Sequence, residues 1–230
     1  MTVVDLNADM GEGFAGDAAL FGLVTSANIA CGFHAGDEQS MRVACQAAVA
    51  ARVAIGAHVS YRDREGFGRR VLDVDPATLG AEAAEQIAAL QAVAAAAGGR
   101  VAYVKPHGAL YHRASVDRDC AGALVRAAAG AQLAVLALPG SELLACAGER
   151  GLTSVAEGFA DRAYAADGTL VPRGDATSLL GADAAGRQAV ALAGSVGSIC
   201  VHSDTPDAVQ VAVAVRIALA AAGVEVRAFA

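Results

Sequence analysis

Most of the histidines in the chain stand directly after short apolar runs that are rich in β-branched residues. His34 follows ANIACGF, His58 follows VAIGA, His107 follows VAYVKP and His202 follows SICV. In parallel α/β folds the carboxyl ends of the strands meet at one rim, where active sites are built. We therefore expect these four imidazoles to lie in one functional site, where they can transfer protons or bind a metal ion.

Acidic and amide side chains follow the same pattern. Asp5, Asn7 and Asp9 alternate along the first apolar run, so they share one face of a strand. Further carboxylates follow later runs, namely Glu157, Asp161 and Asp204. Carboxylates placed at the same rim as the histidines can exchange protons with a substrate or pair with a cation.

Lys105 is the only lysine among 17 basic residues. It stands two residues before His107, so the two side chains point to the same side if Pro106 leaves the strand regular. An amine there can neutralise a phosphoryl group or a developing oxyanion. The alternative is that Lys105 pairs with a rim carboxylate such as Asp9.

The segment DREGFGRR contains charged residues beside Gly66 and Gly68. Its arginines, including Arg69 and Arg70, can hold a substrate carboxylate in a bidentate contact. The alternative is that these charges pair among themselves at the surface. The sequence leaves both open.

Two further kinds of site can be considered. Asp9, His34 and His58 are candidates for a divalent metal site, although they come from three runs and have no diagnostic spacing. Cys31 with His34 would suggest a thiol nucleophile, but Cys31 ends an apolar run, and buried thiols are usually inert. GEG at 11–13 is no dinucleotide fingerprint, and the chain has no GxxxxGK[ST] motif.

Composition limits the function classes. The 230 residues are 55% hydrophobic, with a mean hydropathy of +0.44, which fits one globular domain over 1–230. A net charge of −7 argues against nucleic acid as a partner. No apolar run reaches the roughly 18 residues of a membrane span. Five cysteines without CxxC spacing predict reduced thiols, and the acidic start MTVVDLNADMGEG is unlike a signal peptide, so we expect a cytoplasmic protein.

Apolar runs alternate with alanine-rich stretches of helical period along the whole chain. The runs lie at 3–6, 27–31, 53–57, 101–104, 133–138, 153–155, 199–201 and 224–226, with helices predicted over 76–97, 117–129 and 205–222. This alternation predicts a parallel sheet with crossover helices, and seven or eight units favour a (β/α) barrel. The stretch 165–187 shows little periodicity, which is typical of a lid or a surface loop.

Six blocks of sequence together resemble the LamB/YcsF family. They are DLNADMGEGF (5–14), SANIACGFHAGD (26–37), GAH-SY-DREGFGRR (56–70), VKPHGALY (104–111), EGFADRAYAADGTLVPR (157–173) and ICVH-DTP (199–206), where a dash marks a position that departs from the family pattern. The resemblance implies a seven-stranded (β/α) barrel similar to the glycoside hydrolase and deacetylase barrels. Ser203 stands where the family usually has glycine, which would matter if this position required a positive φ.

The resemblance also implies an activity, that of the A-type subunit of an ATP-dependent 5-oxoprolinase. Such an enzyme opens 5-oxo-L-proline to L-glutamate while ATP, with Mg²⁺, is hydrolysed to ADP and phosphate, in a complex with separate B and C subunits. The expected catalytic residues are Asp9, Lys105, His107, Glu157, His202 and Asp204. The expected substrate-binding residues are Asn7, Glu12, His34, His58, Arg69, Arg70, Asp161 and Arg162.

Within this reaction we expect Lys105 to offset charge on the phosphoryl oxygens. Asp9 or Glu157 would activate water, and His107 or His202 would carry a proton to the leaving ring nitrogen. Two rival functions stay open. One is a metal-dependent amide hydrolase of the deacetylase type with its metal at Asp9, His34 and His58. The other is a non-catalytic substrate-binding subunit whose partners hold the ATP site. Assembly of several copies of the chain is also left open.

Overall fold

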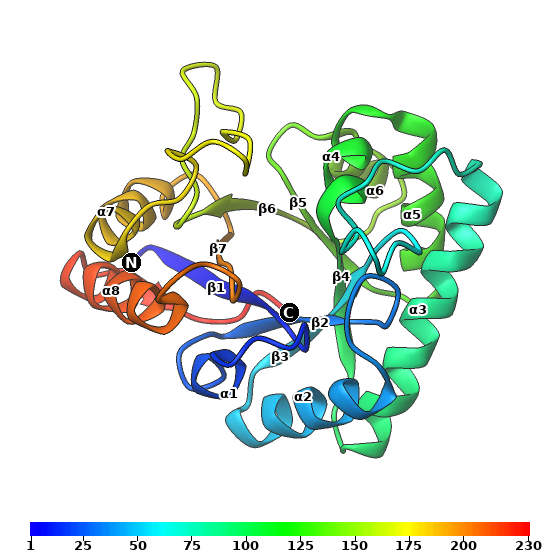
Figure 1. The fold of residues 1–230 in the computed structure, drawn as a ribbon, viewed down its shortest axis with the longest axis horizontal. Coiled ribbons are helices and arrows are strands. Elements are labelled where there is room, and N and C mark those ends of the chain that lie inside the picture. The colour runs from blue at the N-terminus through cyan, green and yellow to red at the C-terminus, as the bar shows by residue number, and fades with distance from the viewer.

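The predicted apolar runs form strands that close into a barrel in the computed structural model, which describes residues 1–230 (Figure 1). The strands of the barrel are β1 (Val3–Met10), β2 (Ser26–Ala30), β3 (Ala54–Val59), β4 (Val101–Pro106), β5 (Ala134–Ala137), β6 (Ser154–Phe159) and β7 (Ser198–Val201). All neighbours are parallel, and β1 pairs with both β2 and β7, so the ring closes. The prediction of a seven-stranded (β/α) barrel is confirmed.

The eighth apolar run is not part of this ring. It forms the two-residue strand β8 (Glu225–Val226), which pairs with Val3 and Val4 at the start of β1. In β1 itself the pairing with β7 begins only at Asp5. The last run therefore extends the sheet beside the amino end of β1 and leaves the site end of the barrel unchanged.

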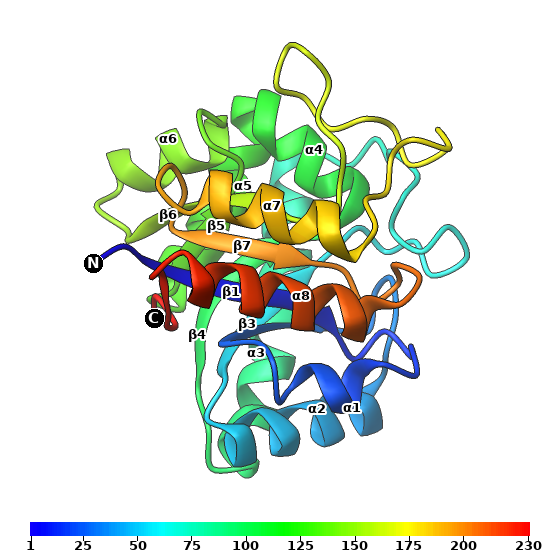
Figure 2. The same cartoon turned by 90° about the vertical axis from the view of Figure 1, so that its left-hand side faces the viewer.

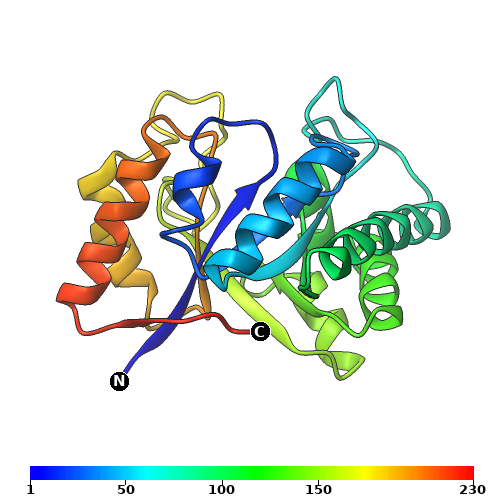
Figure 3. The ribbon, with the colours of Figure 1, turned by 90° about the horizontal axis from the view of Figure 1, so that it is seen from below.

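Helices surround the barrel (Figures 1 and 3). They are α1 (Asp17–Leu20), α2 (Glu38–Ala51), α3 (Pro76–Ala96), α4 (Gly108–Val116), α5 (Arg118–Gly130), α6 (Glu142–Glu149), α7 (Ala182–Leu192) and α8 (Ala208–Ala221). Aspartates start several of them: the side chains of Asp37, Asp75 and Asp117 accept hydrogen bonds from backbone N–H groups of the first turn. No helix combines the length and the apolar character needed to cross a membrane.

Two helix boundaries differ from the sequence expectation. The last helix begins at Ala208 rather than at residue 205, and its N-cap residue Asp207 is left-handed, with φ 57°. Thr205 instead donates to the carboxylate of Asp161 through Oγ1, at 2.6 Å. The second difference is α7, which begins at Ala182 inside the stretch expected to be irregular. Only the part before it is a loop, and this loop projects from the barrel (Figure 1).

The predicted rim is one end of the barrel. Both chain termini lie at the opposite end, while the loops after β1, β3, β6 and β7 gather beyond the carboxyl ends of the strands (Figure 2). All strands of the barrel run in the same direction, so the residues that directly follow each strand lie at this end. Side chains far apart in the sequence are thereby brought together.

The interior of the barrel is polar, whereas such barrels are usually filled by branched apolar side chains. Asn28 donates to Oδ1 of Asn7 at 2.7 Å and to Oδ1 of Asp9 at 2.8 Å, and the Tyr103 hydroxyl donates to Oδ1 of Asn28 at 2.7 Å. The Tyr103 ring fits because residue 56 is glycine: a Cβ there would collide with the ring. This network fixes the orientation of the carboxylates that reach the site.

Candidate active site at the carboxyl end of the barrel

Lys105 lies inside the barrel between two carboxylates. Its Nζ is 3.0 Å from Oε2 of Glu157 and 3.3 Å from Oδ1 of Asp9, and it also lies 3.2 Å from Sγ of Cys200. Burial would lower the pKa of Lys105, but Asp9, Cys200 and Glu157 raise it well above its usual value. The amine is therefore a buried cation, and the pairing with Asp9 that the sequence left open is confirmed.

Asp9 is held ionised by the same arrangement. Burial opposes its charge, but His58 and Lys105 lower its pKa well below the ordinary value. Its Oδ1 also accepts from Asn28. Asp9 lines the pocket described below, so this end of the barrel presents a fixed negative charge beside a fixed positive one.

His202 and Asp161 form a second pair. Nδ1 of His202 lies 2.9 Å from Oδ1 of Asp161, while Oδ2 accepts from the His202 backbone at 2.9 Å and from Thr205 at 2.6 Å. Burial opposes the charge of Asp161, yet His202 and Thr205 lower its pKa below the usual value. An ionised carboxylate only accepts, so Nδ1 of His202 carries the proton and its Nε2 is free to act as a base. The ring stacks on Phe159 with centroids 5.3 Å apart.

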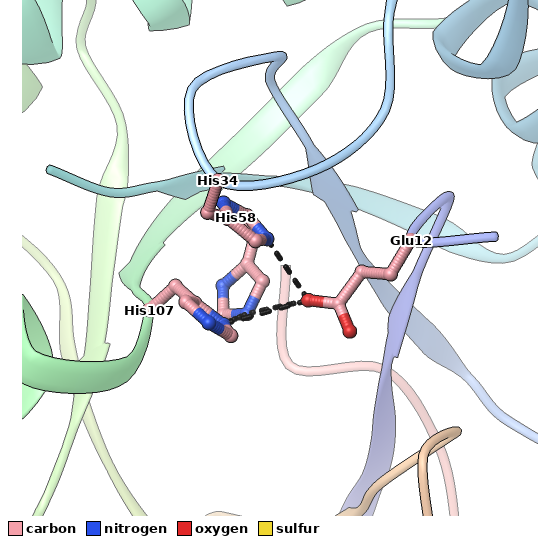
Figure 4. A group of neighbouring side chains, drawn as sticks. All are labelled: Glu12, His34, His58 and His107. Carbon is pink, nitrogen blue, oxygen red and sulfur yellow. Dashed lines mark hydrogen bonds and ion pairs between the residues drawn. The ribbon is translucent and has the colours of Figure 1, made fainter. Parts of the chain in front are cut away.

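Glu12, His34, His58 and His107 form a third group, shown in Figure 4. Oε1 of Glu12 is 2.9 Å from Nε2 of His34, 3.4 Å from Nδ1 of His107 and 3.8 Å from Nε2 of His58. Burial, reinforced by Asp9, raises the pKa of Glu12 to about 8. Burial also lowers the pKa of His34 to about 3, with His58 adding to the effect. The rings of His34 and His107 stack with centroids 3.9 Å apart.

The loop after β3 holds this histidine group in place through Gly68. The residue has φ +67°, and a Cβ there would lie 2.5 Å from Oγ of Ser60, 2.8 Å from Cδ2 of His107 and 2.9 Å from Cβ of His34. Its carbonyl also accepts from the backbone N–H of Ala109 at 2.9 Å. Only glycine combines this backbone conformation with such close approach.

Replacing Gly68 by alanine is therefore expected to displace His34 and His107 and to lower both thermal stability and activity. Gly98 is the matched control, because it has φ +80° and open space around its Cβ position. Gly98→Ala should cost about 1 kcal/mol of backbone strain, while Gly68→Ala should cost clearly more. Thermal unfolding of both variants measures this, and equal losses of stability would contradict the packing role of Gly68.

Two arginines stand at the mouth of the site. Asp204 accepts from Nη2 of Arg69 at 2.5 Å and from Nη1 of Arg173 at 2.7 Å, so one carboxylate ties together the loops after β3 and β6. Both guanidinium groups are partly exposed and keep further donors free. Arg162 is more buried, and it donates to the carbonyls of Val171 (2.6 Å) and Ser178 (3.3 Å).

These groups surround a pocket at the carboxyl end of the barrel. Its lining comprises Asp9, His58, Arg69, Lys105, Pro106, His107, Gly108, Tyr111, His112, Phe159, Arg162, Leu170, Arg173 and His202. Cationic and potentially cationic side chains dominate this lining, so the pocket suits an anionic ligand. Phe159 and Leu170 add a small apolar surface.

The structure brings most of the expected site residues to this region but gives several of them other roles. Asn7 and Asp161 do not line the pocket: Asn7 orients Glu157 and Lys105, and Asp161 orients His202. Asp204 holds the arginines. Arg70 binds Asp63 within its own loop and does not line the pocket, which is the self-pairing that the sequence left open.

Among the polar side chains of the pocket lining, sequence reasoning missed three, namely Tyr111, His112 and Arg173. Tyr111 and Arg173 belong to two of the motif blocks, VKPHGALY and EGFADRAYAADGTLVPR, which could have singled them out. The Tyr111 hydroxyl and Oε1 of Glu157 are buried without a hydrogen bond of normal length, and burial together with the neighbouring Glu157 raises the pKa of Tyr111 well above its usual value. They are two polar atoms that a bound substrate or water can satisfy.

Apart from Cys200, which contacts Lys105, the cysteines and Ser203 make no contact that singles them out in the site. All five cysteines are buried and unpaired, and burial raises the pKa of the Cys31 thiol to about 12, as expected for an inert residue. Ser203 is not among the residues with positive φ, so serine fits the backbone at this position.

Comparison with known proteins gives full-length matches. The family model for the LamB/YcsF family matches residues 4–230. The A-type 5-oxoprolinase subunit of Streptomyces griseus subsp. griseus is 54% identical over 250 aligned positions, which cover 99% of this chain and 100% of that protein. The crystal structure of the lactam utilization protein from Thermus thermophilus is 39% identical, has a TM-score of 0.90 and covers 99% of this chain and 100% of its own.

A more distant likeness concerns the fold alone. The family 4 carbohydrate esterase from Streptomyces lividans, solved with acetate, has a TM-score of 0.53 at 16% identity and covers 100% of this chain and 93% of its own. The similarity of the barrel to the deacetylase barrels is thereby confirmed.

Proposed function

Since the chain belongs to the LamB/YcsF family, we propose that it is the A-type component of a 5-oxoprolinase and that its barrel opens the lactam ring of 5-oxo-L-proline. One observation supports placing the reaction here. Arg69 and Arg173, which Asp204 holds together, line the same pocket as His202, Asp9 and Lys105. A carboxylate-bearing lactam needs a cationic clamp and a proton-transfer group in the same pocket.

The chemistry assigns a task to each group. Water does not open a resonance-stabilised lactam readily, and phosphorylation of its carbonyl oxygen makes the carbon electrophilic. Nε2 of His202 then takes a proton from the attacking water and returns one to the ring nitrogen as the carbon–nitrogen bond breaks. The ring-opened product is an acyl phosphate. A second water attacks its carbonyl carbon, so phosphate leaves with the former carbonyl oxygen and L-glutamate keeps the oxygens of the two water molecules. The cation of Lys105, fixed beside Asp9, stabilises the negative charge that develops on the oxygens bound to this carbon.

The proposal assigns substrate binding and ring opening to this chain. ATP, with its Mg²⁺, enters the reaction in the assembled enzyme with the B and C subunits, as the family resemblance implies. The relatives are named as one subunit of an enzyme, which supports a multi-subunit assembly. Lys105 remains a candidate for contact with the transferred phosphoryl group, although two carboxylates already bind it.

A metal-dependent amide hydrolase is the second candidate function. The group of Glu12, His34, His58 and His107 favours it, because imidazole and carboxylate ligands are those of hydrolytic metal sites. The two candidates differ in their need for ATP. Glutamate released without ATP and lost on chelation would support this second function.

We expect Arg69→Gln to raise the KM for 5-oxoproline by about 10-fold or more while kcat changes less, because the arginine binds the carboxylate in ground state and transition state alike. Arg70→Gln is the matched control, since the neighbouring arginine binds Asp63 outside the pocket. It should leave KM unchanged. Steady-state kinetics of the two variants check this, and an equal rise of KM in both would contradict the clamp.

Ligand binding tests the proposed function before any turnover is measured. The chain, alone and with its partner proteins, is titrated calorimetrically with 5-oxo-L-proline, with 2-pyrrolidinone, which lacks the carboxylate, and with L-proline, which lacks the lactam carbonyl. We expect 5-oxo-L-proline to bind and each truncated compound to bind at least about 10-fold more weakly. Equal binding of all three, or of none in either form, would contradict the proposal.

A further inference from the structure

Four side chains from separate strand ends converge beside the pocket. They are Glu12, His34, His58 and His107, and one ligand atom from each lies within 4.8 Å of the others. His58 belongs to β3, and the other three follow β1, β2 and β4. The three histidines are buried, and the Glu12 side chain is 3% exposed. In Figure 4 ring nitrogens of the histidines face the carboxylate of Glu12.

Hydrogen bonds to backbone carbonyls determine which ring nitrogen carries the proton in two of these histidines. Nδ1 of His58 lies 3.1 Å from the carbonyl oxygen of Lys105, and Nε2 of His107 lies 2.9 Å from the carbonyl oxygen of Phe67. A carbonyl oxygen only accepts, so both of these nitrogens are N–H donors. The inner nitrogens, Nε2 of His58 and Nδ1 of His107, therefore present lone pairs when the rings are neutral.

These two inner nitrogens are only 3.0 Å apart. Two lone pairs at this distance repel each other unless a positive charge lies between them or beside both. Oε1 of Glu12 adds a further electron-rich atom, 3.4 Å from the His107 nitrogen and 3.8 Å from the His58 nitrogen. The arrangement calls for a cation, and burial of the group keeps bulk water from screening it.

We propose that Glu12, His34, His58 and His107 bind one divalent transition-metal ion, with Zn²⁺ as the first candidate. Three imidazoles and one carboxylate suit Zn²⁺, Mn²⁺, Fe²⁺ or Co²⁺, whereas Mg²⁺ and Ca²⁺ prefer oxygen ligands. Two ligand atoms bound at about 2.1 Å lie roughly 3.0 Å apart at the right angle of an octahedral site and roughly 3.4 Å apart at the tetrahedral angle. The inner nitrogens of His58 and His107 are 3.0 Å apart, and Oε1 of Glu12 lies 3.4 Å from the His107 nitrogen, so the separations fall in the range of these two geometries.

The outer contacts of the rings fit the same assignment. A metal-binding histidine usually donates its other N–H to a carbonyl or carboxylate, which fixes the ring and its tautomer. His58 and His107 do so, while Nδ1 of His34 is buried without a partner. Two of the three rings are therefore held in advance with their lone pairs facing the same point.

The proposal changes the ligand set expected from the sequence. Oδ1 of Asp9 lies 3.4 Å from Nε2 of His58, but it also accepts from Asn28 and pairs with Lys105. Glu12 and His107 complete the set around His34 and His58 instead. His58 and His107 also line the pocket, so an ion bound there would supply Lewis-acid polarisation next to the substrate.

The test is metal content, measured on the full chain without any assay of turnover. The chain is dialysed against a chelator, supplied with Zn²⁺ or Co²⁺, freed of excess metal and analysed by elemental mass spectrometry. We expect about one equivalent per chain, and with Co²⁺ a visible absorption spectrum typical of nitrogen and oxygen ligands. Uptake of less than about half an equivalent of either ion would overturn the proposal. It would mean that a proton, and not a metal ion, lies between the inner nitrogens of His58 and His107.

Variants locate the site. Glu12→Gln and His58→Asn each change a proposed metal ligand. Loss of a hydrogen-bond partner of a ligand already lowers metal affinity by roughly 10- to 100-fold, so we expect these variants to lose at least as much. His112→Asn is the matched control, because His112 is exposed and outside the group. It should bind metal like the unmodified chain. Equal affinity in all three variants would overturn the assignment.

Folding of each variant is verified by circular dichroism. If the single variants do not fold, the stoichiometry and the Co²⁺ spectrum of the unmodified chain still decide the question. The outcome is separate from that of the proposed function: a chain can take up metal and fail to bind 5-oxoproline, or bind 5-oxoproline without metal.

Discussion

Replacement of Lys105 by methionine is expected to abolish turnover and to destabilise the chain by about 3–5 kcal/mol. The substitution leaves Asp9 and Glu157 as buried carboxylates without their shared cation. It also removes the positive charge next to the reacting carbon, which should lower kcat by about 10²- to 10³-fold or more. Chemical unfolding and turnover of the assembled enzyme measure the two effects.

Two further variants separate charge from fit. Lys105→Arg keeps the charge, but the larger guanidinium has no space in the buried position that the amine occupies, so turnover should still fall strongly. In Lys105→Met/Glu157→Gln one uncompensated charge is gone, and part of the lost stability should return while turnover stays low. Near-normal turnover of Lys105→Arg would show that no primary amine is required.

Asp161→Asn is expected to lower kcat by roughly 10²- to 10⁴-fold with little change in KM. The amide no longer requires a proton on Nδ1 of His202, so the ring is free to take the other tautomer and lose its base at Nε2. Asp161 is a positioning residue, so nitrogen NMR of His202 provides the specific readout. We expect a change of tautomer in the variant.

Thr205→Val is the matched control for this experiment. It removes the hydrogen bond from Thr205 to Asp161 but leaves the carboxylate and its contact with Nδ1 of His202. We expect a fall in kcat of less than about 10-fold and an unchanged tautomer. A loss in Thr205→Val as large as that in Asp161→Asn would mean that packing around Asp161, and not the tautomer of His202, limits the rate.

The barrel could be predicted from the sequence because each strand is a short apolar run bounded by glycine, proline or polar residues. The first strand also shows how its polar face is used: Asp5, Asn7 and Asp9 alternate and point together into the barrel, as the period of a strand requires. The start of α8 was predicted three residues early. Thr205 and Asp204 look like capping residues, but they bind Asp161 and the two arginines instead.

The sequence indicates which residues reach the rim, but it does not indicate what each side chain contacts there. Adjacent residues in one loop illustrate the limit. Arg69 lines the pocket and Arg70 binds Asp63, and nothing in the letters RR distinguishes them, because the direction of each side chain depends on the path of the loop through Gly68. Likewise, the partnership of Glu12 with three histidines depends on strand ends that only the closed barrel brings together.

The central claim is that the lactam ring is opened in the barrel of this chain, and product release by the assembled enzyme tests it most directly. The B and C subunits are incubated with 5-oxo-L-proline and ATP, without this chain, with the unmodified chain and with Asp161→Asn. We predict glutamate and phosphate in equal amounts with the unmodified chain, and almost no glutamate in the other two reactions. Glutamate release by the B and C subunits alone, or at full rate with Asp161→Asn, would contradict the account.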